Sequence, residues 1–321
     1  MLTLQQSLKV VQGNLTKSVS LFYLGNMKIQ SHLIIVFLIF FAACSTPKQF
    51  TGLDPNAPRA FRDGEYQVSL ELYEDFIERH QHDVLSIPDS IYRGAGLSAY
   101  HLGQSEKSLN YLNLIRHTET ADAEVHYVLA LLNREIDNLS REITALEMYL
   151  EARPEGDQIK LMKERLFVTY VESRNYEKAL DLWMEIENHA RYKEPMLNDY
   201  FRLQEALGNE DLLDDIAEDL LSLNPDNTDA LYHLAKKYFW QAENRYQSEM
   251  EAYEQNRTHR QYAQLLRAFE ILNADFHKSL NYFLRLYAMD PKPAYARYIG
   301  NIYLRFNDDG KARYYHGRAE G

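Results

Sequence analysis

From about residue 60 to the end of the chain, apolar residues recur at the spacing of an α-helix almost everywhere. At the start of this region four apolar residues step by 4, 3 and 4, which places them on one helix face: Tyr66, Leu70, Tyr73 and Ile77. Similar amphipathic segments follow, each preceded by a short turn. The pattern predicts an all-α chain built from successive amphipathic helices.

One of these segments carries a recognisable motif. Residues 174–183 open with a turn residue, continue with an aromatic residue (Tyr176), and then place a small residue (Ala179) before an aliphatic one (Leu180). The segment resembles the second helix of a tetratricopeptide-repeat (TPR) unit, and the segments that begin at Gly64 and Gly103 match the same template. The resemblance covers about residues 60–321 and implies a TPR-type α-α solenoid.

The turn residues recur with a nearly fixed period. Their successive separations are 39, 34, 37, 34, 66 and 33 residues, which cluster on the period of about 34 residues typical of TPR proteins. Three prolines each lie 17 residues after one of these turns, where a TPR helix ends: Pro154, Pro225 and Pro291. About seven helix pairs are therefore expected, and the repeat position of the turn residue falls at Gly64, Gly103, Asp137, Arg174, Gly208, Ala274 and Asn307.

The position at which paired helices approach each other is small in four units and large in two. Small residues fill it at Gly96, Ala130, Ala235 and Gly300. Phe167 and Phe201 occupy it in the other two full units, and those two pairs are expected to splay. Trp183 is expected to be buried against its own and the adjacent helices.

The 66-residue step predicts an extended helical hairpin near the C-terminus. Two apolar stripes run through this region without a break where an extra turn would be required. We therefore expect two long helices, at about 228–255 and 258–289, joined near residues 256–258. The hairpin could act as a docking or dimerisation arm. Alternatively, its stripes satisfy each other as an antiparallel pair, and the sequence favours this second interpretation.

The amino-terminal region has the features of a bacterial lipoprotein signal. A weakly basic start at Met27 and Lys28 leads into eleven consecutive apolar residues, 33–43, followed by Cys44. Eleven helical residues extend only about 16 Å, too short to span a bilayer but typical of a signal peptide. Residues 41–44 resemble the lipobox, which implies that Cys44 is acylated and begins the mature chain. An ordinary secretory signal with a chance cysteine is the alternative.

These features predict the order of the segments. Residues 1–26 are expected to be an upstream extension assigned to the chain by mistake, 27–43 the signal peptide, 44–59 a flexible tether and 60–321 the solenoid. By resemblance to lipoprotein sorting rules, Ser45 lacks the acidic character that retains such proteins in the inner membrane. The expected location is the cell envelope, on the outer membrane facing the periplasm.

Composition narrows the range of partners. The chain has 35 Lys and Arg against 47 Asp and Glu, a formal net charge of −12. Such an acidic surface repels nucleic acid and anionic lipid, so the lipid anchor is the expected contact with the membrane. The single cysteine allows no disulfide within the chain and no cysteine cluster for a metal.

No motif predicts catalysis. The sequence contains no glycine-rich phosphate loop, no His-Glu-x-x-His and no Gly-x-Ser-x-Gly. His80, His82 and Asp83 offer possible metal ligands, but residues two apart on a helix point in different directions, which favours a solvated helix end. We expect no enzyme activity, cofactor or metal.

TPR proteins usually bind extended peptides or a partner helix in a groove lined by the first helix of each repeat. Transferring that pattern onto this sequence predicts twelve groove residues: Arg93, Leu97, Tyr100, Tyr127, Arg134, Arg202, Tyr232, Lys236, Trp240, Arg297, Asn301 and Arg305. Basic residues recur among them, which suggests an acidic or C-terminal peptide partner anchored by the aromatic side chains. Equally, the arginines could pair with neighbouring carboxylates.

Three functional classes remain open. The leading prediction is a lipid-anchored periplasmic adaptor that mediates protein–protein interactions, similar in plan to the TPR lipoprotein of the outer-membrane barrel-assembly machine. A glycan-capture lipoprotein is the second, although starch-utilisation proteins of this plan carry large loop-rich insertions that are missing from this sequence. A structural envelope subunit that oligomerises through its hairpin is the third. The sequence does not identify the partner.

Overall fold

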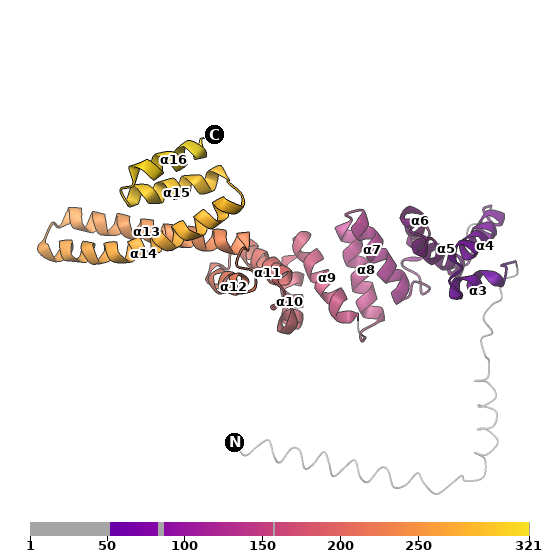
Figure 1. Ribbon diagram of the computed structural model, residues 1–321. Helices are drawn as coiled ribbons and strands as arrows, with labels where there is room; N and C mark the ends of the chain where they lie inside the picture. The colour runs from indigo at the N-terminus through magenta and orange to yellow at the C-terminus, as the bar shows by residue number, and fades with distance from the viewer. Residues whose placement is uncertain (1–51, 83–86, 157, 321) are drawn as a thin grey trace, which may run out of the picture. The chain divides into compact units, whose positions relative to one another are not determined.

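The protein is all-helical throughout the residues that the computed structural model describes, 52–82, 87–156 and 158–320 (Figure 1). Within these ranges lie fourteen α-helices and no β-strand, which confirms the predicted fold class. The expected signal peptide, Cys44 and the first half of the expected tether, 44–51, lie outside the described residues. The helices are α3 (Asn56–Arg62), α4 (Tyr66–Arg79), α5 (Asp89–His101), α6 (Ser105–Ile115), α7 (Ala123–Glu135), α8 (Leu139–Ala152), α9 (Ile159–Glu172), α10 (Tyr176–Ala190), α11 (Glu194–Leu207), α12 (Glu210–Leu223), α13 (Thr228–Gln255), α14 (His259–Met289), α15 (Pro293–Arg305) and α16 (Asp309–Ala319).

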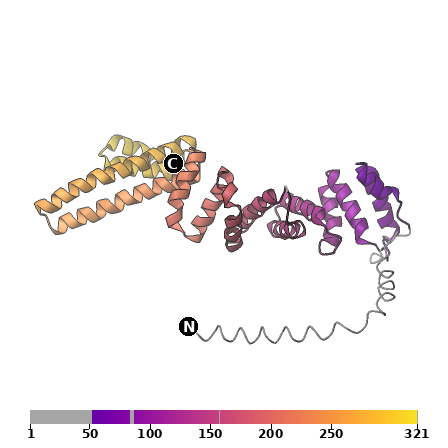
Figure 2. The ribbon, with the colours of Figure 1, turned by 90° about the horizontal axis from the view of Figure 1, so that it is seen from below.

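The helices form seven consecutive pairs, as predicted. Each odd-numbered helix from α3 to α15 packs against the helix that follows it, and each pair also contacts the next pair along the chain (Figures 1 and 2). Some first helices of neighbouring pairs touch directly, for example α5 with α7 and α9 with α11. A single pair cannot cover its own apolar face, so the core is continuous from pair to pair.

Six of the seven pairs turn in the same way. The turn residue adopts a left-handed conformation in each: Gly64, Gly103, Asp137, Arg174, Gly208 and Asn307 have φ between 54° and 80°. Its N–H and the next N–H both bond back to carbonyls of the first helix, as in Gly103 N to Tyr100 O (2.9 Å) and Gln104 N to Ala99 O (2.9 Å). This pair of backbone hydrogen bonds is the Schellman motif, which ends many helices. Ala274 keeps the repeat phase but makes no turn, because it lies inside α14, in agreement with the long helix expected at 258–289.

Small residues allow close packing within several pairs. Ser69, Ser108 and Ser279 occupy equivalent places in α4, α6 and α14. Their hydroxyls donate hydrogen bonds across the pair to backbone carbonyls, Ser108 to Gly96 at 2.8 Å and Ser279 to Ala235 at 2.8 Å. A Cβ atom at Gly96 would lie only 2.5 Å from Leu112 Cδ2, so α5 and α6 pack closely only with glycine at this position.

Aromatic side chains fill the α9–α10 pair instead. Phe167 is fully buried and its ring centroid lies 5.1 Å from that of Trp183. Trp183 in turn stacks on Tyr200 of α11 at 4.2 Å, so it contacts both its own pair and the next one, as expected. The α9–α10 and α11–α12 pairs make fewer close backbone approaches than α5–α6 does, consistent with the expected splaying.

The predicted hairpin is present, with α13 of 28 residues and α14 of 31 residues. The turn between them occupies residues 256–258, as expected. Facing rings pair across the hairpin at seven-residue intervals: Phe239 with Phe276 (5.9 Å), Tyr246 with Phe269 (6.0 Å) and Tyr253 with Tyr262 (5.9 Å). This heptad spacing is typical of an antiparallel coiled coil. The two helices thus satisfy each other, in agreement with the favoured interpretation.

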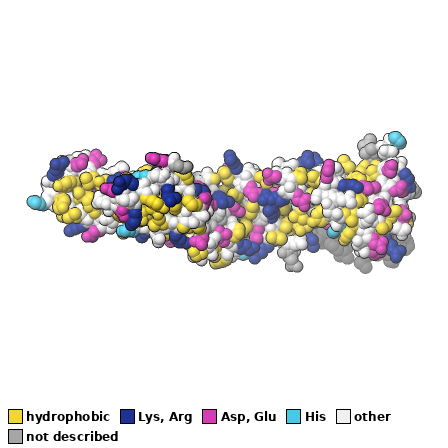
Figure 3. All heavy atoms as spheres, turned by 45° about the horizontal axis from the view of Figure 1, so that its top comes forward, with side chains coloured by type: hydrophobic (Ala, Val, Ile, Leu, Met, Phe, Trp, Pro, Cys, Tyr) yellow, Lys and Arg dark blue, Asp and Glu magenta, His cyan; other side chains and the backbone are white. Residues whose placement is uncertain are grey.

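Beyond the base of the hairpin lies a segment that we call the arm, residues 247–268. Its far end extends past α15 and α16 in both ribbon views (Figures 1 and 2). Compared with helices of about 14 residues elsewhere in the chain, α13 is about 20 Å longer. Tyr262 and Leu266 on the arm remain about half exposed. In the space-filling view, acidic and basic side chains interleave with hydrophobic ones along the visible face, including the hairpin (Figure 3).

Candidate functional site

A cavity with a volume of about 830 Å³ lies between α11, α12 and α13. It forms where the aromatic-filled pairs meet the start of the long hairpin. Four of the predicted groove residues line it: Arg202, Tyr232, Lys236 and Trp240. The other lining residues are Phe201, Glu205, Gly208, Glu210, Asp211, Leu213, Asp214, Asp229, His233, Lys237, Gln241 and Asn244.

One side of this cavity is an aromatic and basic strip on α13, formed by Tyr232, Lys236 and Trp240. These residues are four apart, so they lie on the same helix face. The ammonium of Lys236 lies 5.3 Å from the centroid of the Tyr232 ring, within cation–π distance. Trp240 is 47% exposed, although it packs edge-on against Phe239 at 5.3 Å. A tryptophan with half of its surface in water is a ready anchor for an apolar group.

Neighbouring rings hold Tyr232 in place. Its ring centroid lies 5.7 Å from that of Tyr295 and 6.3 Å from that of Phe283. Burial raises the pKa of the Tyr232 hydroxyl, and the nearby Tyr298 and Tyr295 add to the effect. The phenol is therefore neutral at ordinary pH and can donate a hydrogen bond to a ligand.

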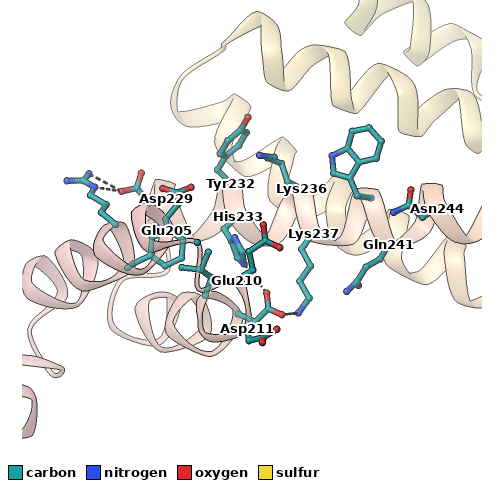
Figure 4. A pocket seen from close by; sticks show the side chains of 16 residues that line it. Glu205, Glu210, Asp211, Asp229, Tyr232, His233, Lys236, Lys237, Gln241 and Asn244 are labelled. Carbon is teal, nitrogen blue, oxygen red and sulfur yellow. Dashed lines mark hydrogen bonds and ion pairs between the residues drawn. The ribbon is translucent and has the colours of Figure 1, made fainter. Parts of the chain in front are cut away.

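The opposite side of the cavity is acidic. Asp214 on α12 receives Lys237 Nζ at 2.6 Å and His233 Nε2 at 2.9 Å. Burial opposes ionisation of Asp214, but these two hydrogen bonds outweigh it and lower its pKa. Figure 4 shows the division: Lys237 extends toward the carboxylates of α12, whereas Tyr232 and Lys236 point to the other side of α13.

The charges of the residues that line this cavity argue against the acidic peptide expected from the sequence. The lining contains three basic residues (Arg202, Lys236, Lys237) and five acidic ones (Glu205, Glu210, Asp211, Asp214, Asp229), a difference of −2 with His233 neutral. Arg202 is paired with Asp229 at 2.9 Å and Lys237 with Asp214. Lys236 is the cavity's one cation with no carboxylate within 4 Å among the described residues. The cavity is thus a poor attractor for a strongly acidic segment.

Several other predicted groove residues are engaged within the fold. Arg93 pairs with Asp122 at 2.6 Å and Glu124 at 2.7 Å. Arg134 makes a two-pronged contact with the carboxylate of Glu172, and Arg305 makes a similar contact with Glu243. These arginines link neighbouring helix pairs, which is the structural role that the sequence left open as an alternative.

The remaining predicted residues divide by exposure. Leu97 was wrongly placed in the groove, because it is fully buried among packed helices. Tyr100 and Tyr127 are half-buried, and Tyr127 packs near Tyr149 at 6.0 Å. Asn301 Oδ1 accepts a hydrogen bond from His316 Nε2 at 3.0 Å, while Arg297 is exposed. None of these four half-buried or exposed residues lines the α11–α13 cavity.

Sequence reasoning missed the acidic wall of the site. Glu210 and Asp211 come from the first turn of α12, and His233 and Lys237 lie one position beyond the strip residues on α13. The template used for prediction considered first helices alone, so it could not select residues of α12. The acidic run at 210–215 was the available signal.

The described residues also limit other chemistry. Among them, no group of three or more His, Cys, Asp or Glu side chains is arranged to hold a metal ion. The ring of His80 is hydrogen-bonded within its own helix, with Nδ1 2.8 Å from the carbonyl oxygen of Phe76. Over the same residues no helix combines the length and apolarity needed to cross a bilayer.

Comparison with known proteins gives distant structural likeness alone. No protein-family model and no curated protein sequence matches the chain. A solved structure from Bacteroides ovatus ATCC 8483, described as a candidate protein-binding protein, is 19% identical, with a TM-score of 0.47, covering 70% of this chain and 99% of its own. A TPR protein from Parabacteroides merdae ATCC 43184 is 14% identical, with a TM-score of 0.38, covering 83% of this chain and 90% of its own. YrrB, a TPR protein described as having an unusual peptide-binding site, is 13% identical, with a TM-score of 0.42, covering 56% of this chain and 88% of its own.

Proposed function

We propose that this protein is a lipid-anchored adaptor of the bacterial cell envelope that binds a protein partner through the α11–α13 cavity. The observation that carries the proposal is the half-exposed Trp240 beside Lys236 and Tyr232 on the rim of an 830 Å³ cavity. Large aromatic side chains that stay exposed next to a concavity are typical binding hot spots. All three residues lie on α13, a helix of 28 residues.

The proposed partner segment is extended and carries an apolar anchor residue. Its anchor would pack on Trp240, and its backbone carbonyls would accept from the ammonium of Lys236. Because the lining carries a formal charge difference of −2, a neutral or basic segment fits better than an acidic one. The partner chemistry proposed for this cavity therefore differs from the acidic peptide expected from sequence.

The anchor belongs to the proposal as well. Cys44 follows an eleven-residue apolar run in the arrangement of a lipobox, which supports acylation at this residue. Two acyl chains on one residue give stable attachment to a membrane, and the acidic solenoid would then face away from anionic headgroups. We propose the outer membrane, with the solenoid in the periplasm, as the location.

Site-specific photocrosslinking tests the partner site. A photoreactive phenylalanine analogue is placed at Gln241, which lines the cavity, and in a second variant at Met184, which is 65% exposed on α10. Crosslinked adducts identified by mass spectrometry should form from position 241 but not from 184. Adding Trp240→Ala to the Gln241 variant should remove most of the adduct. Equal adducts at both positions would refute the site.

Metabolic labelling tests the anchor separately. Cells supplied with an alkyne fatty acid should label the wild-type chain, and Cys44→Ser should abolish the label. The wild-type protein should stay in the membrane fraction after a high-salt wash. An unlabelled wild-type chain that washes off would contradict the anchor and leave the cavity proposal intact.

A further inference from the structure

A second, smaller pocket lies on the opposite set of helices. It occupies a slot between α6 and α8, the second helices of neighbouring pairs, and α7 forms its floor. Its volume is about 190 Å³. We call it the α6–α8 slot; its lining is Asn113, Arg116, His117, His126, Leu129, Asn133, Arg141, Thr144, Ala145 and Met148.

The slot has an apolar floor and a cationic rim. Leu129 and Ala145 are buried and Met148 is half-buried, so the interior offers mainly carbon. Arg116, directly after the end of α6, is partly exposed, and Arg141 in α8 is exposed. A pocket with an apolar interior and a few polar groups at fixed places is the usual form of a small-ligand site.

None of the slot's ten lining residues is acidic, in a chain of net charge −12. Neither Arg116 nor Arg141 has a carboxylate within 4 Å among the described residues, unlike Arg93, Arg134 and Arg202. Arg116 is positioned by neutral neighbours, with Nε 2.9 Å from His117 Nε2 and an amino nitrogen 3.5 Å from Asn113 Oδ1. The two guanidinium groups are therefore available to an anion.

The wall of the slot also contains an unsatisfied polar group. Asn133 is only 2% exposed, and its Nδ2 donates to the carbonyl of Leu129 at 2.7 Å. Its Oδ1 accepts from no donor among the described residues. Buried amide oxygens are nearly always hydrogen-bonded, so a vacant acceptor beside a pocket indicates that a donor from outside the chain completes it.

The α6–α8 slot and the α11–α13 cavity have opposite electrostatics. The slot carries two arginines and no acid, whereas the cavity carries three basic and five acidic residues. Burial also lowers the pKa of His126 on the slot floor, which keeps that imidazole neutral and the interior apolar. One chain thus offers one site suited to an anion and another that is not.

We propose that the α6–α8 slot binds a carboxylate carried on a small apolar group, with an N–H donor next to it. Arg116 and Arg141 hold the carboxylate, and Leu129, Ala145 and Met148 surround the apolar part. A leucine-sized residue with its α-carboxylate and amide N–H has this chemistry. It occurs both as a free acylated amino acid and as the C-terminal residue of a protein.

Calorimetric titration with matched probes tests the chemistry. The probes are N-acetyl-leucine, its neutral analogue N-acetyl-leucinamide, and a hexapeptide ending in leucine with a free or an amidated C-terminus. The free carboxylates should bind at least tenfold more tightly than the amides, since a two-pronged arginine contact is lost in the amide. Tighter binding of the peptide assigns a protein C-terminus as the source, and tighter binding of N-acetyl-leucine assigns a small metabolite. Failure of both carboxylates to bind at 10 mM would overturn the proposal.

Two variants locate the binding. The double variant Arg116→Gln/Arg141→Gln should weaken the carboxylate probe by at least tenfold, about 1.4 kcal/mol or more. Arg267→Gln, an exposed arginine on the arm, is the matched control and should leave binding unchanged. A second variant, Ala145→Ile on α8, fills the apolar interior of the slot and should block the probe without changing any charge. Thermal melts establish that each variant is folded, and unchanged affinity in a folded double variant would refute the site.

Discussion

The α5–α6 and α9–α10 pairs solve the same packing problem with opposite residues. In the first, Gly96 lets the helices touch and Ser108 bonds to its carbonyl at 2.8 Å. In the second, Phe167 takes the glycine position, Ala179 takes the serine position, and Trp183 fills the space that remains. One pair is held by close backbone approach and the other by aromatic volume.

The difference shows that the same helix–turn–helix unit accepts either a close backbone approach or a large aromatic side chain at this position. The α13–α14 pair uses both methods in turn. Ala235 and Ser279 close its base, and the aromatic rungs close its arm.

The largest expected effect is in the aromatic pair. Trp183→Ala removes a side chain that is 2% exposed and contacts Phe167 and Tyr200, so we expect a loss of about 3–5 kcal/mol. The chain's other tryptophan, Trp240, is 47% exposed, and Trp240→Ala should cost far less. Denaturant unfolding of both variants provides the measurement. Equal losses would mean that Trp183 does not carry the packing of this pair.

The second effect tests the close-packed pair. Gly96→Ala places a methyl group 2.5 Å from Leu112 Cδ2, and the required shift should cost about 1–3 kcal/mol. Gly317→Ala in α16 meets nothing within 4 Å and should instead stabilise the helix by about 0.5–1 kcal/mol. The two substitutions are chemically identical, so chemical denaturation should give opposite signs. Two effects of the same sign would contradict the close approach at Gly96.

A third prediction concerns the arm. Removing residues 247–253 together with 262–268 takes seven residues from each helix and preserves the Tyr246–Phe269 contact. We expect a loss of about 0.7–2 kcal/mol, in proportion to the fourteen residues removed. Removing 247–250 alone shifts the register of one helix against the other. The hairpin should then melt at a lower temperature, as measured by circular dichroism. Light scattering on the same variants tests self-association through the arm.

The smallest expected effect is a pH dependence of the folding stability that arises in the α9–α10 pair and not in the α5–α6 pair. Burial, with help from Lys160 and Lys193, lowers the pKa of His189 on α10, against the pull of Glu164. Because the folded pKa is below the unfolded value of about 6.5, the folded state binds fewer protons. Stability is therefore full above about pH 6.5 and falls as the pH drops through that value.

Thermal melts between pH 8 and 5 measure this slope. His189→Gln should reduce this pH dependence in part. The remaining pH dependence should come from His126, because burial lowers the pKa of that side chain as well. A slope of the same size in the variant would exclude His189 as a source. Gly96→Ala should leave the slope unchanged, since Gly96 lies in a different helix pair from His189 and His126.

Most of the fold could be predicted from the helical periodicity of apolar residues along the chain. The hairpin helices begin and end within one residue of expectation, at Thr228–Gln255 and His259–Met289, because each apolar stripe is continuous along the chain. The repeat phase also located six of the seven turns. Ala274 keeps the repeat phase without a turn, because the unbroken apolar stripe continues the helix through it, as expected.

The candidate sites were less accessible from sequence. Arg134 and its partner Glu172 are 38 residues apart, so no local pattern separates a paired arginine from a free one. Leu97 was misplaced because burial depends on which neighbouring helix covers its face. The α6–α8 slot draws its lining from three helices, and nothing in any single helix marks it.

The six repeated turns have one more consequence. Asp137, Arg174 and Asn307 sit at φ of 54–61°, where a Cβ atom crowds the following carbonyl by about 1 kcal/mol or more. The paired backbone hydrogen bonds keep these bends in shape regardless of side chain, so glycine could replace each residue without redrawing the chain path. Glycine substitutions at these three positions should therefore raise the thermal stability of the protein, and none of the three positions lines the α11–α13 cavity or the α6–α8 slot.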